Sequence, residues 1–309
     1  MINRKEIERN TKMTKTAYIS IIGRPNVGKS TLMNNLLGEK VSIVSAKPQT
    51  TRNRIAGILT EGENQFVFLD TPGVHKSKNR LGDYMMKSVR STVRSADAVI
   101  LIADAAHPAG SVEMNLIEQI KSADLPSILV LNKIDMTNAE KLAETIANYA
   151  SLHDFDAVVP TAAINGKNVD IVLKEAEKFL YDGEWMFDED SITDQPERQI
   201  ASEIIREQLL RVLNDEVPHG TAIVIEEFKE TSKMISIRAE IFCEKASHKG
   251  IIIGKNGETL KKIGSFARED LEEFFGIKVY INLWVKVKEK WRDSDFVLNS
   301  FGYNPKDLD

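Results

Sequence analysis

Two kinds of hydrophobic pattern alternate along residues 15–182. Short, mostly β-branched apolar runs predict buried strands, and stretches with an apolar residue every three or four positions predict helices. The predicted strands are residues 18–22, 54–59, 65–69, 99–104, 128–131 and 157–160. The predicted helices are residues 31–37, 83–94, 139–149 and 169–180. This alternation predicts an α/β domain with a mostly parallel six-stranded sheet and helices on both faces.

A different pattern begins at residue 200 and predicts a second domain, of the α+β class. Apolar residues at helical spacing predict a helix from Ile200 to Leu213, which two strands at 221–228 and 234–242 follow. A second helical face runs from Leu260 to Phe275, and residues 279–287 alternate as a last strand. Residues 182–197 hold seven acidic residues and no basic residue, which is typical of an exposed linker. The predicted boundaries are therefore 1–14 for an N-terminal lead-in, 15–182, 183–199 for the linker, 200–303, and 304–309 for a C-terminal tail.

Composition narrows the class of protein. The chain has 309 residues, of which 42% are hydrophobic and 28% charged, and its net charge is −5. These values are ordinary for a globular protein of about two domains. The single cysteine, Cys243, excludes a disulfide framework and a cysteine-rich zinc site, and we interpret it as a buried apolar residue. Without a signal-peptide pattern or a long apolar run, we expect a cytoplasmic protein.

The segment between the first predicted strand and the first predicted helix carries the pattern GxxxxGK[ST]. Strand, pattern and helix in this order are the setting of a phosphate-binding P-loop. The glycines let successive N–H groups point at phosphate oxygens, the helix adds the positive end of its dipole, and Lys29 neutralises the β- and γ-phosphates. We therefore expect phosphate binding by Gly23, Arg24, Pro25, Asn26, Val27, Gly28, Lys29, Ser30 and Thr31.

A second polar segment follows the strand at 65–69. Asp70 stands at the carboxyl end of this strand, a position that faces the ligand crevice of an α/β sheet. It can hold the water shell of a Mg²⁺ ion, and the Gly73 N–H can meet the γ-phosphate. We expect Asp70, Thr71, Pro72 and Gly73 to complete the phosphate site.

The metal site needs two further hydroxyl groups. The Ser30 hydroxyl is placed to bind Mg²⁺, and a loop that senses the nucleotide needs a hydroxyl that reaches the ion. Thr50 and Thr51 both satisfy this requirement, and the sequence does not choose between them. Arg52 and Arg54 in the same loop are interpreted as solvated charges, with phosphate or RNA contact as the alternative.

Residues 132–135, Asn-Lys-Ile-Asp, follow the strand at 128–131 and predict a guanine site. Asp135 can accept hydrogen bonds from N1–H and the exocyclic amine of guanine, and adenine lacks both donors. Asn132 is expected to tie this loop to the P-loop, and the stem of Lys133 to cover the base. The Ala162 N–H is expected to donate to guanine O6. The full predicted set is Asn132, Lys133, Ile134, Asp135, Thr161, Ala162 and Ala163.

A GxxG loop, Gly254-Lys255-Asn256-Gly257, lies in the most basic part of the chain. Residues 245–292 hold eleven Lys and Arg against six Asp and Glu. Two glycines let the backbone approach a nucleic-acid backbone, and the apolar residues before them can form a wall for unstacked bases. The arrangement resembles a KH type II domain, and we expect RNA contacts from Ile251, Ile252, Gly254, Lys255, Asn256, Gly257 and Lys261.

Tryptophans and lysines near the C-terminus leave two interpretations open. Lys286, Lys288 and Lys290 alternate beside Trp284 and Trp291. They could be phosphate contacts with base stacking, or a solvated strand face with core tryptophans.

Taken together, the motifs resemble the Era GTPase family, a branch of the translation-factor-like P-loop GTPases. The matching segments are GRPNVGKS, KPQTTR, DTPGV, NKID and GIIIGKNGETLKKIG, in that order from about residue 14 to residue 303. The resemblance implies a GTPase that binds GTP or GDP with Mg²⁺ and holds the 3′ end of small-subunit (16S) rRNA through its KH domain. It also implies a role in maturation of the 30S ribosomal subunit and peripheral association with the cytoplasmic membrane. We expect a monomer.

The sequence departs from better-known relatives at Val74 and at Thr161-Ala162-Ala163, where relatives usually have Ser-Ala followed by Lys or Glu. Val74 stands where Ras-like GTPases have a glutamine that orients the attacking water. Asn26 resembles the asparagine of potassium-activated relatives, which implies that K⁺ speeds hydrolysis.

Three rival hypotheses remain. The protein could be an RNA-binding switch in which hydrolysis is incidental, a P-loop kinase or ATPase, or a tRNA-modifying, potassium-activated GTPase. The GxxG region argues against the last of these, which would need a catalytic tail of its own.

Overall fold

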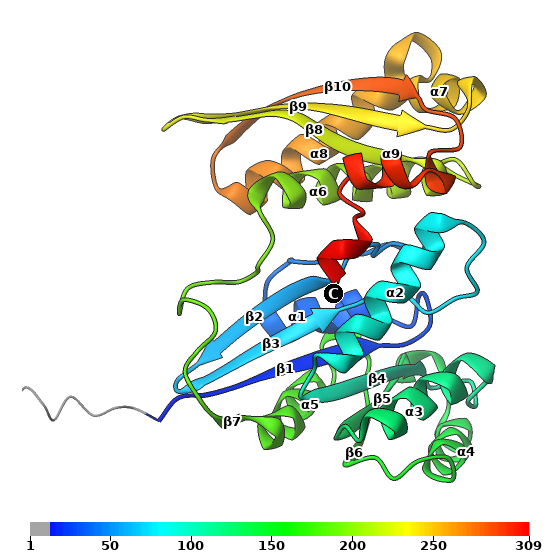
Figure 1. Ribbon diagram of the computed structural model, residues 1–309, viewed down its shortest axis with the longest axis vertical. Coiled ribbons are helices and arrows are strands. Elements are labelled where there is room, and N and C mark those ends of the chain that lie inside the picture. Colours follow the sequence, from blue (N-terminus) through cyan, green and yellow to red (C-terminus); the bar gives the residue numbers. More distant parts are fainter. Residues whose placement is uncertain (1–12, 309) are drawn as a thin grey trace, which may run out of the picture.

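Two bodies, joined by one ordered segment, make up the computed structural model, which describes residues 13–308 (Figure 1). Nearly all of the predicted lead-in, residues 1–12, lies outside the described residues. The predicted α/β domain forms the lower body in Figure 1, and the predicted α+β domain forms the upper one. Among the described residues, no helix is long and apolar enough to cross a membrane.

The first domain is built on one sheet in the order β2-β3-β1-β4-β5-β6. Only β2 runs antiparallel to its neighbour in this order. The strands are β1 (Lys15–Ile22), β2 (Ile55–Glu61), β3 (Asn64–Asp70), β4 (Ala98–Asp104), β5 (Ser127–Asn132) and β6 (Ala157–Pro160). The prediction of six strands was one short, because the two residues of β7 (Tyr181–Asp182) pair antiparallel with β1. A strand of two residues has no hydrophobic period to detect.

Helices cover both faces of this sheet, because its central strands are apolar on both sides. On one face, α1 and α5 pack against residues such as Ile100 and Ile102, and on the other α2, α3 and α4 pack against residues such as Val99 and Leu101. The helices are α1 (Lys29–Leu37), α2 (Arg80–Arg94), α3 (Ser111–Ala123), α4 (Ala139–Ala150) and α5 (Val169–Ala176). The sequence analysis did not predict α3.

The second domain has a three-stranded sheet in the order β10-β9-β8, covered by helices on one face. β10 runs parallel to β9, and β8 runs antiparallel to it. The elements are α6 (Glu197–Val212), β8 (Ala222–Glu230), β9 (Met234–Cys243), α7 (Ala246–Ile253), α8 (Glu258–Phe275), β10 (Lys278–Val287) and α9 (Asp295–Ser300). Cys243 is buried in this core, as predicted.

The acidic segment between the domains is not the exposed linker that its charges predict. It lies along β2, where the Ile58 N–H donates to the Ile192 carbonyl over 3.0 Å and Thr193 forms a bridge with Gly57. The Gln65 side chain bonds the backbone of Met186 and Phe187. Most acidic side chains of the segment are exposed, but Asp194 accepts a hydrogen bond from the Ala56 N–H and the segment's backbone pairs with the edge strand β2. Composition alone does not reveal such pairing.

The domains meet through the loop that connects α1 to β2. Arg52 is only 2% exposed, and its guanidinium donates to the carbonyls of Thr221, over 2.6 Å, and His219, over 2.9 Å. The interpretation of Arg52 as a solvated charge was therefore wrong. Its guanidinium also lies over the Trp291 ring, 5.8 Å from the ring centroid. Arg54 binds Asp194 of the connecting segment instead.

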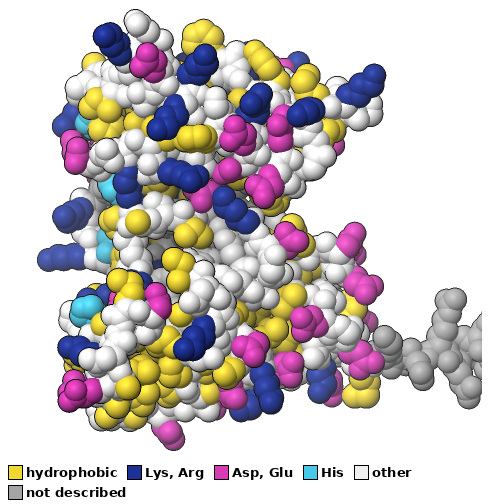
Figure 2. All heavy atoms as spheres, turned by 180° about the vertical axis from the view of Figure 1, so that it is seen from behind, with side chains coloured by type: hydrophobic (Ala, Val, Ile, Leu, Met, Phe, Trp, Pro, Cys, Tyr) yellow, Lys and Arg dark blue, Asp and Glu magenta, His cyan; other side chains and the backbone are white. Residues whose placement is uncertain are grey.

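The C-terminal segment adds an apolar contact to this interface. Residues of α2 and of the chain after β10 form one buried cluster. Its members include Tyr84, Met85, Trp291, Leu298 and Tyr303. Figure 2 shows the waist between the two domains from behind, with Lys and Arg side chains gathered around it.

Candidate functional site: a phosphate cradle beside a nucleic-acid groove

The P-loop, residues 23–30, connects β1 to α1 and is held from several sides. Gly28 has a φ of 104°, and a Cβ there would lie 2.3 Å from the Asn132 side-chain nitrogen, so only glycine fits. The Asn132 amide donates to the Val27 carbonyl over 2.7 Å. The predicted tie between the guanine loop and the P-loop is therefore present.

Several other predicted phosphate-site residues have side chains engaged elsewhere in the domain. The Arg24 guanidinium points away from the cradle and pairs with Glu113 of α3, with 2.6 Å between Nη2 and Oε2. Val27 is buried in the core, and the Thr71 hydroxyl donates to the Ile21 carbonyl. Pro72 is buried and Thr31 half-buried. Gly73 lies against Pro25, where a Cβ would come within 2.6 Å of the proline Cα.

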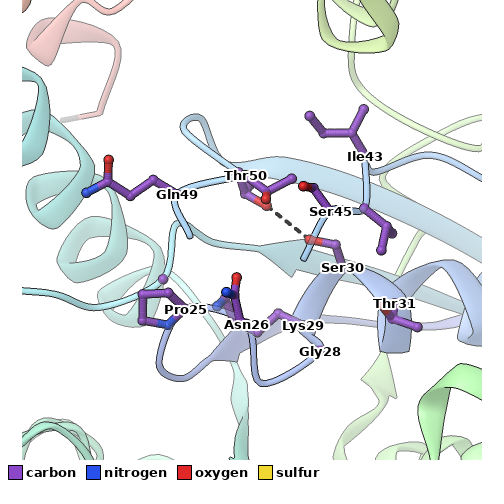
Figure 3. Close-up of a pocket in the computed structure, with 13 residues that line it drawn as sticks. Pro25, Asn26, Gly28, Lys29, Ser30, Thr31, Ile43, Ser45, Gln49 and Thr50 are labelled. Atoms are coloured by element: carbon purple, nitrogen blue, oxygen red, sulfur yellow. Dashed lines mark hydrogen bonds between the residues drawn. The ribbon is translucent and has the colours of Figure 1, made fainter. Parts of the chain in front are cut away.

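The hydroxyl groups predicted for a metal site converge on one carboxylate. The Ser30 hydroxyl donates to Asp70 Oδ2 over 2.6 Å, and the Thr51 hydroxyl lies 3.2 Å from the same carboxylate oxygen. Thr51 Oγ1 also lies 3.0 Å from Ser30 Oγ, the contact drawn as a dashed line at Ser30 in Figure 3. The Thr50 hydroxyl instead donates to the Lys47 carbonyl. The structure therefore places Thr51, not Thr50, at this cluster.

Ser42 is a member of the cluster that the sequence analysis missed. Its hydroxyl donates to Asp70 Oδ2 over 2.8 Å, and it is 1% exposed. It follows the P-loop helix without belonging to any motif, so only the fold brings it to Asp70.

Charge in the cradle is poorly solvated. Burial lowers the pKa of Lys29 to about 8, an effect that Asp70 opposes. Burial also raises the pKa of Asp70, against the opposing charge of Lys29 and the hydroxyl hydrogen bonds. The Lys29 ammonium donates to the Arg24 carbonyl over 2.9 Å. A polyanion and a divalent cation would give each group a partner of opposite charge.

The donor set fits a Mg²⁺ ion. Asp70 Oδ1 is buried and has no hydrogen-bond partner among the described residues. One carboxylate with hydroxyl groups suits an ion that keeps several waters and takes its remaining ligands from phosphates. Consistently, residues 13–308 hold no cluster of three or more His, Cys, Asp or Glu for a metal bound by protein alone.

The guanine loop is organised by Asn132. Its side-chain oxygen accepts hydrogen bonds from the Ala163 N–H, over 2.8 Å, and from the Thr161 hydroxyl. Thr161 also accepts a backbone bond from Ile134, which joins the two segments of the predicted site. Asp135 is exposed, and Lys133 pairs with Asp104 over 3.1 Å.

Ala162 differs from its expected role. Its N–H donates to the Lys167 carbonyl over 3.2 Å, so a guanine oxygen would have to replace or share this bond.

The second domain has a groove of about 610 Å³ between α8 and β10. Of the predicted RNA contacts, Gly257 and Lys261 line it, and Lys255 and Asn256 are exposed at the loop beside it. The lining also includes residues that the sequence analysis missed: Leu260, Gly264, Ser265 and Arg268 on α8, and Tyr280, Asn282 and Leu283 on β10, which is distant along the chain.

The loop residues have the backbone conformation that glycine favours. Gly254 and Gly257 have φ of 74° and 79°, and Asn256, at 51°, shares the left-handed region. Ile251 is 51% exposed, but Ile252 is fully buried in the domain core. The prediction that Ile252 contacts RNA was therefore wrong, because the helical turn of α7 directs it inward.

Two family models match the chain in separate regions. The 50S ribosome-binding GTPase family matches residues 18–133, and the KH domain family matches residues 216–292. The first match lies within the first domain and spans the phosphate cradle, and the second lies within the second domain and spans the groove.

Full-length relatives match both domains at once. The chain is 47% identical over 290 residues to GTPase Era of Ruminiclostridium cellulolyticum, a match that covers 94% of this chain and 97% of the relative. A crystal structure of Era with MgGDPNP and nucleotides 1506–1542 of 16S ribosomal RNA superposes with a TM-score of 0.90 at 40% identity, covering 94% of this chain and 99% of the other. A variant of Aquifex aeolicus Era bound to GDP and AlF₄⁻ superposes with a TM-score of 0.91 at 40% identity, with coverages of 94% and 100%.

Proposed function

This chain belongs to the Era family of GTPases, and we propose that its GTPase cycle controls a grip on the 3′ end of 16S rRNA during maturation of the 30S subunit. The observation that carries the proposal is the loop of residues 43–52. Thr51 of this loop joins the phosphate cradle, and its neighbour Arg52 enters the second domain. A single loop therefore connects the phosphate cradle to the domain that carries the groove.

In the proposed reaction, the P-loop amides and Lys29 bind the β- and γ-phosphates and stabilise the charge that develops on them. Bound Mg²⁺, held by Ser30, Asp70 and Thr51, would neutralise the phosphates. Asp135 selects guanine, and Asn132 keeps its loop in register with the P-loop. Val74 offers no carboxamide to the attacking water, so a backbone group or a cation must orient it.

We also propose that K⁺ supplies this cation next to Asn26. Asn26 has a φ of 63°, its side-chain amide donates to the Ala46 carbonyl over 2.8 Å, and the residue lines the cradle. K⁺ should then raise kcat relative to Na⁺, and Asn26→Ala should remove the difference. Equal turnover of the wild type in the two salts would refute the potassium site without affecting the proposed roles of the other residues.

RNA is proposed to lie along the groove between α8 and β10. The GxxG loop would approach the backbone of about four nucleotides, as in KH domains generally. Lys255, Lys261 and Arg268 supply positive charge along one side, and Leu260 and Leu283 supply apolar walls for unstacked bases.

The proposed coupling follows from how tightly residues 43–51 close over the P-loop. The cavity between them measures about 50 Å³, room for no more than a few water molecules (Figure 3). A triphosphate must therefore move this loop. Lys47, which donates to the Leu210 carbonyl, and Arg206, which donates to the Thr50 carbonyl, would transmit that movement to α6.

The direct test is binding of the purified protein to an RNA of nucleotides 1506–1542 and to isolated ribosomal subunits. Affinity for the RNA and for 30S subunits should differ between GTP-analogue and GDP states, and 50S subunits serve as the control. Preferential binding to 50S subunits, which the description of the GTPase family names, would overturn the proposal.

We further propose that the protein acts as a monomer in the cytoplasm, with peripheral membrane association. The membrane part rests on the family resemblance alone. Sedimentation of the purified protein tests the monomer, and fractionation of cells tests the location. Protein that stays with the membranes after a high-salt wash would contradict peripheral binding.

A further inference from the structure

The open face of the second domain's sheet carries two exposed aromatic rings. In β10, Val279, Ile281, Leu283 and Val285 face the helices, and the alternate residues face away. Among these, Tyr280 is 56% exposed and Trp284 is 58% exposed. Exposing large aromatic rings to water is unfavourable in free energy, and such rings gathered on one surface commonly mark a binding site.

Only part of this face is covered by the protein itself. Trp284 aligns with Glu240 of β9, and the next outward pair is Lys286 with Phe242. Phe242 packs against Phe301 of the C-terminal segment, with 4.6 Å between ring centroids. The C-terminal segment therefore buries the Phe242 end of the face and stops short of Trp284.

The two tryptophans singled out in the sequence thus differ. Trp291 is fully buried and donates to the Gly220 carbonyl, so it is a core residue. Trp284 has no such role. The core alternative therefore holds for Trp291, and Trp284 is left exposed on the strand.

Charge on the face favours a polyanion. Three cations, Lys229, Arg238 and Lys286, accompany two carboxylates, Glu227 and Glu240. Each carboxylate is already paired with one or more of these cations, and the side chains of Arg238 and Lys286 remain more than half exposed. The surface therefore combines flat rings with an excess of one positive charge, and rings beside positive charge are how proteins bind unpaired bases and their phosphates.

The face is also continuous with the proposed RNA groove. Tyr280 and Asn282 belong to it and line the groove as well, because β10 is the edge strand between the two surfaces. Trp284 lies four residues from Tyr280, about 13 Å along the strand. A single strand that leaves the groove over this edge would meet both rings.

We propose that the open face of the sheet is a second RNA site, on which bases beyond those in the groove stack against Trp284 and Tyr280. Open sheets with stacking aromatic residues bind RNA in this way in unrelated domains. This site rests on the proposed function, because it extends the same RNA beyond the groove.

The test compares two RNA lengths with the protein saturated in a GTP analogue and Mg²⁺. The short probe has about four nucleotides, enough for a KH groove, and the long probe is the RNA of nucleotides 1506–1542. Trp284→Ala should weaken the long probe about five- to a hundred-fold and leave the short probe unchanged. Trp284→Phe should restore most of the affinity. Phe296→Ala, at an exposed position on α9, is the matched control and should change neither.

Fluorescence gives a second readout. Stacking on an exposed indole should quench it, so the long probe should quench wild-type emission more than that of Trp284→Phe. Unchanged long-probe affinity in Trp284→Ala would overturn the second site. Charge reversal at Lys255 tests the groove separately, because it should weaken both probes. If it weakens neither, the proposed function itself fails.

Discussion

The P-loop and the GxxG loop are both glycine-containing turns that precede a helix, and they differ in how tightly they are enclosed. A Cβ on Gly28 would collide with Asn132, whereas a Cβ on Gly257 would meet nothing within 4 Å. The first loop is held in one conformation, which suits a small ligand whose negative charge needs preorganised partners on every side. The second loop is exposed, which suits RNA, because the chain on both sides of the bound nucleotides must pass freely out of the site.

The largest expected effect is at the closed site. Asp135→Ala removes two charge-assisted hydrogen bonds to guanine, each worth about 1.5–3 kcal/mol, so GTP affinity should fall about a hundred- to ten-thousand-fold. ATP affinity should hardly change, because adenine does not use this carboxylate. Competition binding with the two nucleotides measures both, and a preserved preference for GTP would favour the ATPase hypothesis.

At the open loop, the combined change Lys255→Glu and Asn256→Asp should weaken RNA binding about ten- to a hundred-fold, because it places two negative charges beside phosphates. Lys255→Gln alone should lower the slope of log K against log salt concentration by about one, because one phosphate contact is lost. Basal GTP hydrolysis in the absence of RNA is the control and should not change. Unaltered RNA affinity would remove the loop from the binding surface.

Alanine at the two glycines tests the contrast in enclosure itself. Gly28→Ala combines backbone strain with a collision and should destabilise the first domain by about 2–5 kcal/mol. Gly257→Ala carries only the strain of a positive φ, about 1–2 kcal/mol. Thermal unfolding of both variants measures how much stability each loses. Equal losses of stability would show that enclosure does not distinguish the two loops.

The smallest expected effect concerns the buried carboxylate. The folded protein raises the pKa of Asp70 above its usual 3.8, so its contribution to stability is largest in acid and is lost as pH rises through the folded pKa. Without nucleotide or Mg²⁺, Asp70→Asn should therefore gain stability relative to wild type as the pH rises from 4 toward 7, by a few degrees in Tm. With Mg²⁺ and GTP added, the wild type should become the more stable of the two proteins. A difference that is independent of pH would contradict this account.

Motifs that are contiguous in the sequence were predictable, and contacts between distant segments were not. The P-loop, Asp70, Asn132 and the GxxG loop each sit next to a strand or helix whose period is clear. Ser42, Arg52 and the acidic segment before α6 take their roles from the fold. Arg52 in particular has the sequence context of a solvated loop charge, and only the docking of the second domain buries it.

The central claim is that the loop of residues 43–52 couples the two sites. Coupling between binding sites is reciprocal, so RNA should change the ratio of GTP-analogue to GDP affinity, within the usual range of about 5- to 150-fold. Arg52→Ala removes the link to Thr221 and His219, and Arg54→Ala, which removes the ion pair with Asp194, is the control. The decisive measurement is this affinity ratio with and without the RNA. The account predicts a shift in wild type and Arg54→Ala that disappears in Arg52→Ala, and an equal shift in all three proteins would contradict it.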